Sequence, residues 1–171
     1  DKASKNALVV GAVSEVLNYV DNSSVVMSSF SNYGPTDDFR IKPYLVSKGV
    51  NVYSTSSSSD TAYSNSSGTS MAAPTVTGGL VLVQQYFGAP YLNASTLKGL
   101  ALHTAEEAGP SDGPDHMFGW GLLNVAEMIG VLEQEGSESI VEENTLSNGD
   151  TYSFNVLALG SEPLKVSISW T

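Results

Sequence analysis

A run of small residues followed by a long helical pattern is the feature that most constrains the fold of this chain. The run is Gly68-Thr69-Ser70-Met71-Ala72-Ala73-Pro74, and the apolar residues after it, Val76, Leu80, Val83 and Phe87, fall three or four positions apart. This spacing predicts a helix over residues 70–87 that ends at Gly88. Because glycine and alanine recur inside it, the helix is thin and can pack closely within a domain.

Ser70 lies where this helix is expected to begin. A hydroxyl at that point has a fixed position, and backbone N–H groups and the positive end of the helix dipole can stabilise negative charge beside it. Such surroundings suit a nucleophile. However, a serine at a helix start more often caps the helix by accepting a backbone hydrogen bond. Other features of the sequence are needed to choose between the nucleophile and the helix cap.

The patterns on either side indicate an α/β domain. Ala7–Val13 is almost wholly apolar and rich in valine, which is typical of a strand buried on both faces of a parallel sheet. Further strands are predicted at residues 25–30, 44–46 and 50–53. Residues 54–67 are dominated by Ser, Thr, Asn and Asp, and they predict a loop that leads directly to Ser70.

Two more helices and a change of composition follow. Ser95 is predicted to cap a helix over residues 96–103, and Asn124 is predicted to cap a helix over residues 125–132. After Gly136, alternation and β-branched residues predict strands at residues 139–141, 151–156 and 165–170. We therefore expect an α/β domain over residues 1–134 and the first strands of a β-rich module over residues 138–171, joined by an acidic linker.

Charge and composition argue against several classes of function. The chain carries 18 Asp and Glu but seven Lys and Arg, a net charge of -11. A nucleic-acid partner is therefore not expected, because phosphate binding relies on clustered cations. No apolar run approaches the length of a membrane span, so we expect none. The absence of cysteine excludes disulfides and thiol chemistry.

Five segments, in order along the chain, resemble the subtilisin-like serine proteases, or subtilases. Gly68–Pro74, with Val76 and Gly78, is similar to the nucleophile signature of that family. The other four segments are Val10–Val13, Ser29–Pro35, Lys42–Thr55 and Gly119–Asn124. Together they favour the nucleophile interpretation of Ser70 over the helix cap. The chain departs from the usual pattern at Tyr44, Ser47-Lys48 and Thr75, and none of these departures removes a catalytic group.

The resemblance implies a subtilisin-like parallel sheet with flanking helices, partial in this chain, and a peptide-bond hydrolase of the Ser-His-Asp type. Ser70 would be the nucleophile, its backbone N–H would be one donor of the oxyanion hole, and Phe30 would flank the cleft for a polypeptide substrate. The tail from Pro163 onward is similar to the start of the β-sandwich that follows many secreted subtilases. A secreted or cell-envelope location is therefore expected.

The resemblance also implies that part of the catalytic machinery lies elsewhere. In the family, the catalytic Asp and His and an oxyanion Asn precede the serine, so they are expected upstream of residue 1. His103 and His116, the two histidines of the chain, follow Ser70, and neither is expected to be the general base. The chain is then the C-terminal half of a catalytic domain, inactive alone. Because half a sheet exposes apolar surface, we expect it to bind the N-terminal half or to self-associate.

Other interpretations receive less support from the residues. A non-catalytic binding module on the same scaffold is the alternative if the upstream acid or base has been lost. No cofactor is identifiable; calcium is possible by resemblance, without assigned ligands, and Asp112, Asp115 and His116 fit a solvated loop better than a metal site. A nucleophile of the α/β-hydrolase type would need a second glycine where Ala72 stands, and we set it aside.

Overall fold

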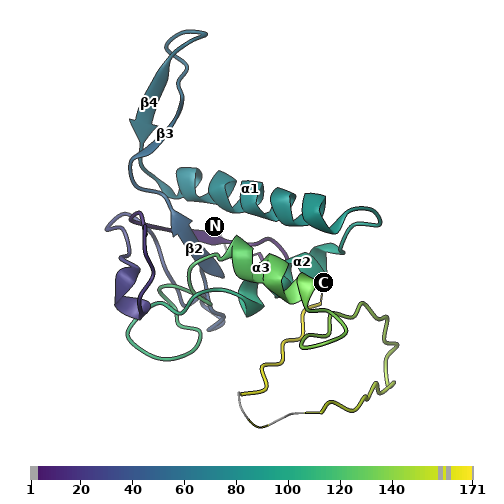
Figure 1. Cartoon of the computed structure of the whole chain (residues 1–171). Helices are drawn as coiled ribbons and strands as arrows, with labels where there is room; N and C mark the ends of the chain where they lie inside the picture. Colours follow the sequence, from purple (N-terminus) through teal and green to yellow (C-terminus); the bar gives the residue numbers. More distant parts are fainter. Residues whose placement is uncertain (1–3, 158–159, 161–162, 171) are drawn as a thin grey trace.

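The computed structural model describes residues 4–157, 160 and 163–170. Its elements in chain order are β1 (Val10–Val13), the short 3-10 helix η1 (Asn22–Ser24), β2 (Leu45–Lys48), β3 (Val52–Thr55), β4 (Tyr63–Ser66), α1 (Thr69–Phe87), α2 (Ala94–His103) and α3 (Val125–Glu133). Figure 1 shows α1 lying across the sheet of β1 and β2. In this view α2 and α3 lie below α1, and the β3–β4 hairpin projects upward near its start. The predicted parallel sheet with flanking helices is thus confirmed.

The core of the sheet is the parallel pair of β1 and β2. The register runs from Val10↔Leu45 to Val13↔Lys48. Most residues of both strands are buried, as the apolar run at residues 7–13 predicts. The sheet continues beyond β2, because Val46 N–H donates to Gly121 O at 2.9 Å and Leu123 N–H donates to Val46 O at 3.1 Å.

The strand predicted at residues 25–30 is wrong. Within the described chain, this segment makes a single antiparallel bridge, between Met27 and Val13. At this edge Ala12 O accepts from both Ser28 N–H, at 3.0 Å, and Ser28 Oγ, at 2.8 Å, whereas Ala12 N–H donates to Ser31 Oγ at 3.0 Å. Because a hydroxyl satisfies the Ala12 N–H in place of a strand carbonyl, the segment turns away instead of pairing along its length.

The long helix agrees closely with its prediction. α1 begins one residue before the predicted start and ends at Phe87, where Gly88 adopts a φ of 82° and donates its N–H to Gln84 O. Its buried residues are Ala72, Val76, Gly79 and Val83, and they form the face that packs on β1, β2 and α3. Leu45, Leu92, Leu100 and Met128 complete the main core around this face.

Gly79 allows α1 to approach the start of α3 closely. A Cβ at this position would lie 2.8 Å from Val125 Cγ2, whereas a Cβ at the exposed Gly78 would meet nothing within 4 Å. We expect Gly79→Ala to lower the free energy of unfolding by about 1–3 kcal/mol through overpacking. Gly78→Ala should instead raise it by up to about 1 kcal/mol, because alanine is the better helix former. Urea unfolding of both variants measures the difference, and equal effects would contradict the packing role of Gly79.

Residues 52–66 form a hairpin where a strand and a loop were predicted. β3 includes part of the strand predicted at residues 50–53, but its partner is β4, antiparallel, in the register Val52↔Ser66 to Thr55↔Tyr63. The Ser-rich composition conceals β4. Its strand-forming residue is Tyr63, which stacks on Tyr53 with 5.5 Å between the ring centroids. The hairpin stands away from the body and leads into the start of α1 (Figure 1).

The two shorter helices differ in how they begin. The N-cap of α2 is Asn93, so the predicted cap at Ser95 is wrong. The carboxylate of Glu143 serves this helix end instead, accepting hydrogen bonds from Asn93 N–H at 2.7 Å and from Asn93 Nδ2 at 2.6 Å. In α3 the prediction is confirmed, because Asn124 Oδ1 accepts from Glu127 N–H at 3.0 Å.

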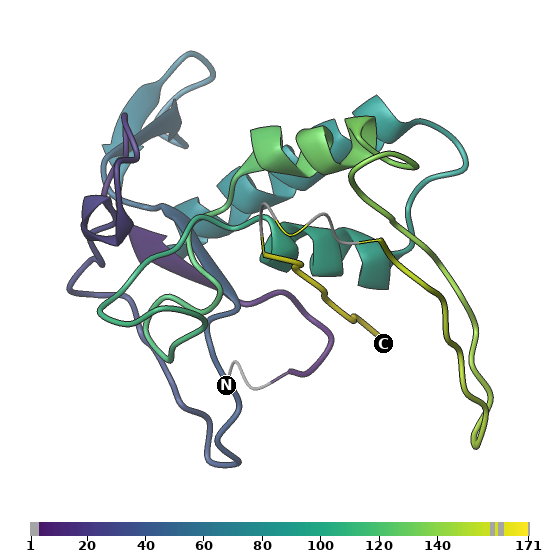
Figure 2. The ribbon, with the colours of Figure 1, turned by 60° about the horizontal axis from the view of Figure 1, so that its bottom comes forward.

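The segment after α3 holds no assigned strand in its described residues, 138–157, 160 and 163–170. A strand needs a partner, and the returning tail meets α2 instead, where His103 Nδ1 lies 2.8 Å from Ser167 Oγ. Figure 2 shows this segment leaving α3 as an open loop and coming back to α2. Residues 158–159, 161–162 and 171 of the predicted module lie outside the described residues. The β-rich module therefore stays a prediction.

Candidate active site

Backbone contacts fix the position at which α1 begins. Gly68 N–H donates to Gly49 O at 2.8 Å, and Gly68 O accepts from Met71 N–H at 3.0 Å to open the helix. Gly49 lies so close to its neighbours that a Cβ there would be 2.6 Å from Ala12 Cβ and 2.8 Å from Gly68 O. The missing side chain lets the chain after β2, strand β1 and the first turn of α1 meet, and this contact sets the position of Ser70.

Ser70 is the second residue of α1, and its side chain is exposed. The N-cap position belongs to Gly68, which has no side chain, so Ser70 is not the capping residue of this helix. Among the described residues, Ser70 Oγ makes no hydrogen bond, and the N–H groups of Thr69 and Ser70 donate none. Free first-turn amides of this kind carry the positive end of the helix dipole. The hydroxyl is therefore available to a ligand, beside donors that could bind an anion.

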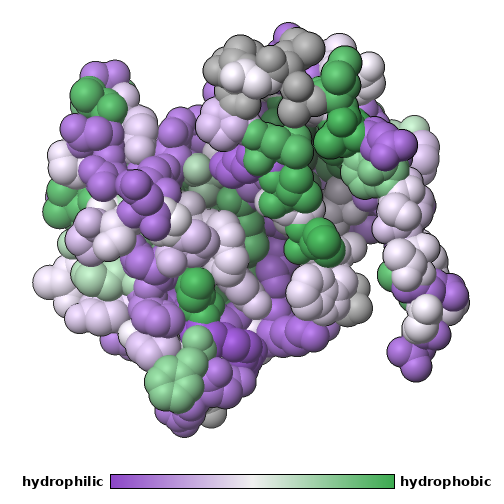
Figure 3. Space-filling view, turned by 90° about the horizontal axis from the view of Figure 1, so that it is seen from below, coloured by the Kyte–Doolittle hydropathy of each residue, from purple (hydrophilic) through white to green (hydrophobic). Residues whose placement is uncertain are grey.

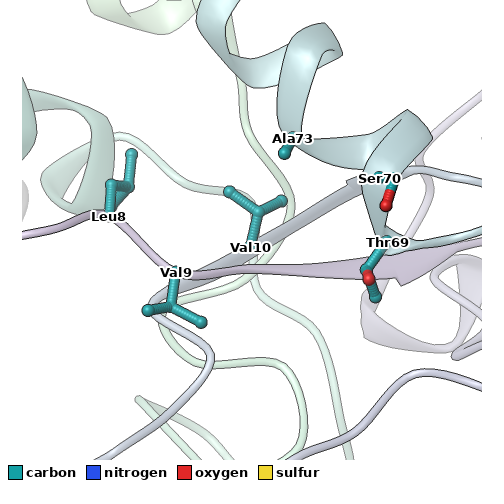
Figure 4. Close-up of a pocket in the computed structure, with 6 residues that line it drawn as sticks. All are labelled: Leu8, Val9, Val10, Thr69, Ser70 and Ala73. Atoms are coloured by element: carbon teal, nitrogen blue, oxygen red, sulfur yellow. The ribbon is translucent and has the colours of Figure 1, made fainter. Parts of the chain in front are cut away.

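A hollow of about 260 Å³ lies next to Ser70. It is lined by Leu8 and Val9, the two residues before β1, by Val10 of β1, and from α1 by Thr69, Ser70 and Ala73. Figure 4 shows Thr69 and Ser70 at the start of the helix, with Ala73 one turn further along, above Val10. The lining is mostly apolar, and the two hydroxyl groups lie at one end of it.

The edge of β1 that borders this hollow is partly unpaired. Val9 O and Val13 O accept hydrogen bonds from the β2 side, so the odd-numbered residues of the strand bond in that direction. Backbone groups alternate along a strand, so the even-numbered residues bond to the opposite edge. There Ser28 and Ser31 satisfy the backbone of Ala12, but no described residue pairs with the backbone of Leu8 or Val10. The hollow therefore offers free strand backbone as well as an exposed hydroxyl.

Neither histidine lies at this hollow. His103 ends α2, and burial, with a further contribution from Lys165, lowers its pKa. It lines a separate hollow of about 310 Å³, together with Glu106 and Glu127. His116 is exposed, and its backbone O accepts from Gly34 N–H at 3.0 Å. The described residues that line the Ser70 hollow include no titratable side chain.

Phe30 is not among the residues that line the Ser70 hollow. Its side chain is 45% exposed in a turn where Ser31 N–H donates to Ser28 O at 3.1 Å. The structure thus leaves Phe30 accessible without bringing it to Ser70. Its role beside the cleft stays a prediction.

The residues that the structure describes give no set of metal ligands. No group of three or more His, Asp or Glu side chains converges among them. Asp115 Oδ2 is buried without a hydrogen-bond partner, while Oδ1 accepts from Met117 N–H at 2.6 Å and Phe118 N–H at 2.7 Å. A single free carboxylate oxygen does not fit a calcium site, so calcium has no assigned ligands in this part of the chain.

Two parts of the site are missing from the sequence-based prediction. Gly49 stands between two predicted strands, where any loop glycine could stand, and its close contacts appear only once β1 and α1 are in place. Leu8 and Val9 have the apolar character of core residues. They become the wall of a hollow because α1 begins above them. The presence of a glycine between two strand segments was the one signal available for the first of these features.

The comparisons with known proteins find relatives that are proteases. The sequence profile described as the Subtilase family matches residues 1–121. The PII-type proteinase of Lacticaseibacillus paracasei is 32% identical over 136 residues, which are 69% of this chain and 7% of that protein. The minor extracellular protease Vpr of Bacillus subtilis (strain 168) is 28% identical over 159 residues, which are 75% of this chain and 20% of that protein.

A solved structure supports the same likeness at the level of the fold. The Clostridium perfringens CspB protease matches with a TM-score of 0.63 and 25% sequence identity, over 77% of this chain and 28% of that chain. The chain spans 7% and 20% of the length of the two relatives named above. In the described part, none of the helices combines the length and apolar character that crossing a membrane requires.

Proposed function

The chain belongs to the subtilase family of serine proteases, and from this membership we propose that Ser70 is the nucleophile of a Ser-His-Asp endopeptidase. The observation that carries the proposal is the exposed hydroxyl at the start of α1, beside N–H groups that no described residue binds. A serine in this position needs a general base to become reactive. The proposal therefore concerns the nucleophile and one oxyanion donor, and it assigns the base to another segment.

The proposed reaction begins when Ser70 Oγ attacks the carbonyl carbon of a peptide bond and a histidine accepts the hydroxyl proton. The new C–O bond leaves negative charge on the carbonyl oxygen, and the backbone N–H of Ser70 donates to that oxygen at the positive end of α1. Breaking the C–N bond then forms the acyl-enzyme, and the histidine returns the proton to the leaving amine. Water hydrolyses the acyl-enzyme in the second half of the reaction.

The histidine and its carboxylate partner are proposed to come from a companion segment, the N-terminal half of the catalytic domain. Three observations support this assignment. No titratable side chain lines the Ser70 hollow among the described residues, and the backbone of Leu8 and Val10 beside it is free to pair with another strand. On the outer face of α1, Val81 and Leu82 are 59% and 57% exposed, as expected of a helix that another layer covers.

Without the companion segment, the chain is proposed to self-associate. Apolar side chains also reach the surface seen from below (Figure 3), and the tail exposes several more, Leu164, Val166, Ile168 and Trp170. We further propose a location outside the cytoplasm, since Vpr is named an extracellular protease. Polypeptide is the proposed substrate, because hydrolysis of peptide bonds is what the named relatives have in common.

A fluorophosphonate probe, which reacts with activated serines, tests the proposal on the complete protein and on residues 1–171 alone. We expect labelling of the complete protein at Ser70, and labelling at least about 10²-fold slower on residues 1–171, because the general base is absent. Fast labelling of residues 1–171 alone would contradict the companion segment. If neither protein is labelled, the alternative of a non-catalytic binding module on this scaffold is favoured.

A further inference from the structure

Three side chains converge on the backbone just before β1. Lys42 Nζ donates to Ser4 O at 2.5 Å, Lys98 Nζ donates to Lys5 O at 3.0 Å, and Tyr44 OH donates to the same Lys5 O at 2.7 Å. The two ammonium groups also lie against the Tyr44 ring, 3.6 Å and 3.9 Å from its centroid. We name Lys42, Tyr44 and Lys98 the lysine clasp.

In the described part of the chain, the lysines of the clasp bind backbone carbonyl oxygens and not carboxylates. Carboxylates greatly outnumber cations in this chain, yet the ion pairs among the described residues are Arg40–Asp38 and Lys48–Glu15, and neither involves the clasp. Lys42 is only 5% exposed, and burying an ammonium group is costly unless it is paired. Burial lowers the pKa of Lys42, and the like charge of Lys98 lowers it further. The partners of these lysines are carbonyl oxygens, so the clasp serves to hold that backbone.

The backbone that the clasp holds leads directly to the Ser70 hollow. Tyr44 binds it at two points, through its OH at Lys5 O and through its N–H at Val9 O, the latter at 2.8 Å. Leu8 lies between these two points and lines the hollow. Strand β1 itself is held by β2 and by the core, but residues 4–8 precede that pairing. Among the described residues, the clasp provides the long-range hydrogen bonds of this lead-in.

We propose that Lys42, Tyr44 and Lys98 are positioning residues that hold residues 4–9, and with them the unpaired edge of β1, where the companion segment can bind beside Ser70. The proposal rests on the proposed function, because the companion segment belongs to it. The clasp touches neither Ser70 nor the hollow and acts only through the path of the chain before β1. Its loss should free the lead-in while the core, which is formed by other residues, stays folded.

The test uses Lys98→Met in the complete protein, because Met keeps most of the apolar stem and removes the charge. We expect native-state cleavage by thermolysin between Ala7 and Leu8 to become about tenfold faster, the factor that corresponds to one charge-assisted hydrogen bond, because cleavage requires the lead-in to detach. Fluorophosphonate labelling at Ser70 should slow by a similar factor, while amide hydrogen exchange in α1 is unchanged. Tyr44→Phe, a smaller change, should act in the same direction. Lys98→Arg should restore both readouts, because its guanidinium can donate to Lys5 O and lie against the ring.

The matched control is Lys48→Met, which removes the ion pair with Glu15 from the end of β2 but touches none of the residues before β1. It should leave both the cleavage between Ala7 and Leu8 and the labelling of Ser70 unchanged. An unchanged cleavage rate in Lys98→Met would overturn the clasp. Faster cleavage with unchanged labelling would overturn its positioning role. A complete protein that is never labelled would overturn the proposed function and the positioning role with it, whereas the cleavage rate would still decide whether the clasp holds the lead-in.

Discussion

Replacing Ser70 with alanine is expected to reduce peptide hydrolysis by the complete protein at least about 10³-fold in kcat, because no acyl-enzyme can form without the hydroxyl. Stability should not fall. Ser70 Oγ is exposed and bonds to no described residue, so the change breaks no hydrogen bond of the fold. Alanine is also the better helix former. Hydrolysis of a fluorogenic peptide and thermal unfolding of the same samples measure the two effects.

Thr77→Ala is the matched control for this substitution. Thr77 carries another exposed hydroxyl of α1, which donates to Ala73 O at 3.0 Å. Its loss should change kcat by no more than about twofold, as is usual for an exposed position. Activity that survives in Ser70→Ala would refute the nucleophile assignment. A parallel loss of stability and activity in Ser70→Ala would instead give Ser70 a structural role.

The elements that could be predicted from the sequence are those whose buried residues show a regular apolar pattern within one segment. The apolar spacing within Thr69–Phe87 defines a buried face, and the run at residues 7–13 contains a strand that is buried on both sides. Asn124 caps α3 by accepting a hydrogen bond from the N–H of Glu127, only three residues further along the sequence. In each case the residues that decide the structure are neighbours in sequence, so a local pattern is sufficient.

The elements that were missed depend on partners far along the chain. The N-cap residue of α2, Asn93, is held by Glu143, 50 residues further along the chain, and no pattern near Ser95 indicates this contact. β4 pairs with β3, and Tyr63 stacks on Tyr53 across the hairpin, although the composition of β4 is that of a loop. The segment at residues 25–30 has strand-forming residues, but the Ser31 hydroxyl accepts the Ala12 N–H at the point where a strand ladder would continue. Tertiary partners therefore override local propensity at these places.

In the candidate site too, features set by neighbouring residues were predictable and features set by distant partners were not. Ser70 was predictable because its surroundings form a family signature, and the start of α1 places it at the helix end as expected. The free edge of β1, the close contact at Gly49 and the lysine clasp were not predictable, since each joins segments that are far apart in sequence. The local sequence thus indicates the candidate nucleophile, whereas the residues that fix its surroundings are evident only in the structure.

The second large effect, a loss of stability, is expected at Gly121. This residue lies in the turn at which residues 121–123 join the sheet beside β2. Its φ is 115°, and a Cβ would lie 1.9 Å from Glu106 O, a backbone atom that cannot move without disturbing its own pairing. We expect Gly121→Ala to lower the free energy of unfolding by at least about 3 kcal/mol, of which about 1–3 kcal/mol is backbone strain and the remainder is the clash. Denaturant unfolding of the variant measures this loss.

Gly113→Ala separates the two causes, because Gly113 also has a positive φ, 82°, but a Cβ there would meet nothing within 4 Å. It should show the backbone strain alone, and equal losses in the two variants would contradict the clash.

The consequence for the site follows from Val46 N–H, which donates to Gly121 O. Displacing that bond disturbs β2, and β2 leads to Gly49, whose carbonyl holds the start of α1. Gly121→Ala should therefore slow labelling of Ser70 in the molecules that remain folded, whereas Gly113→Ala should not.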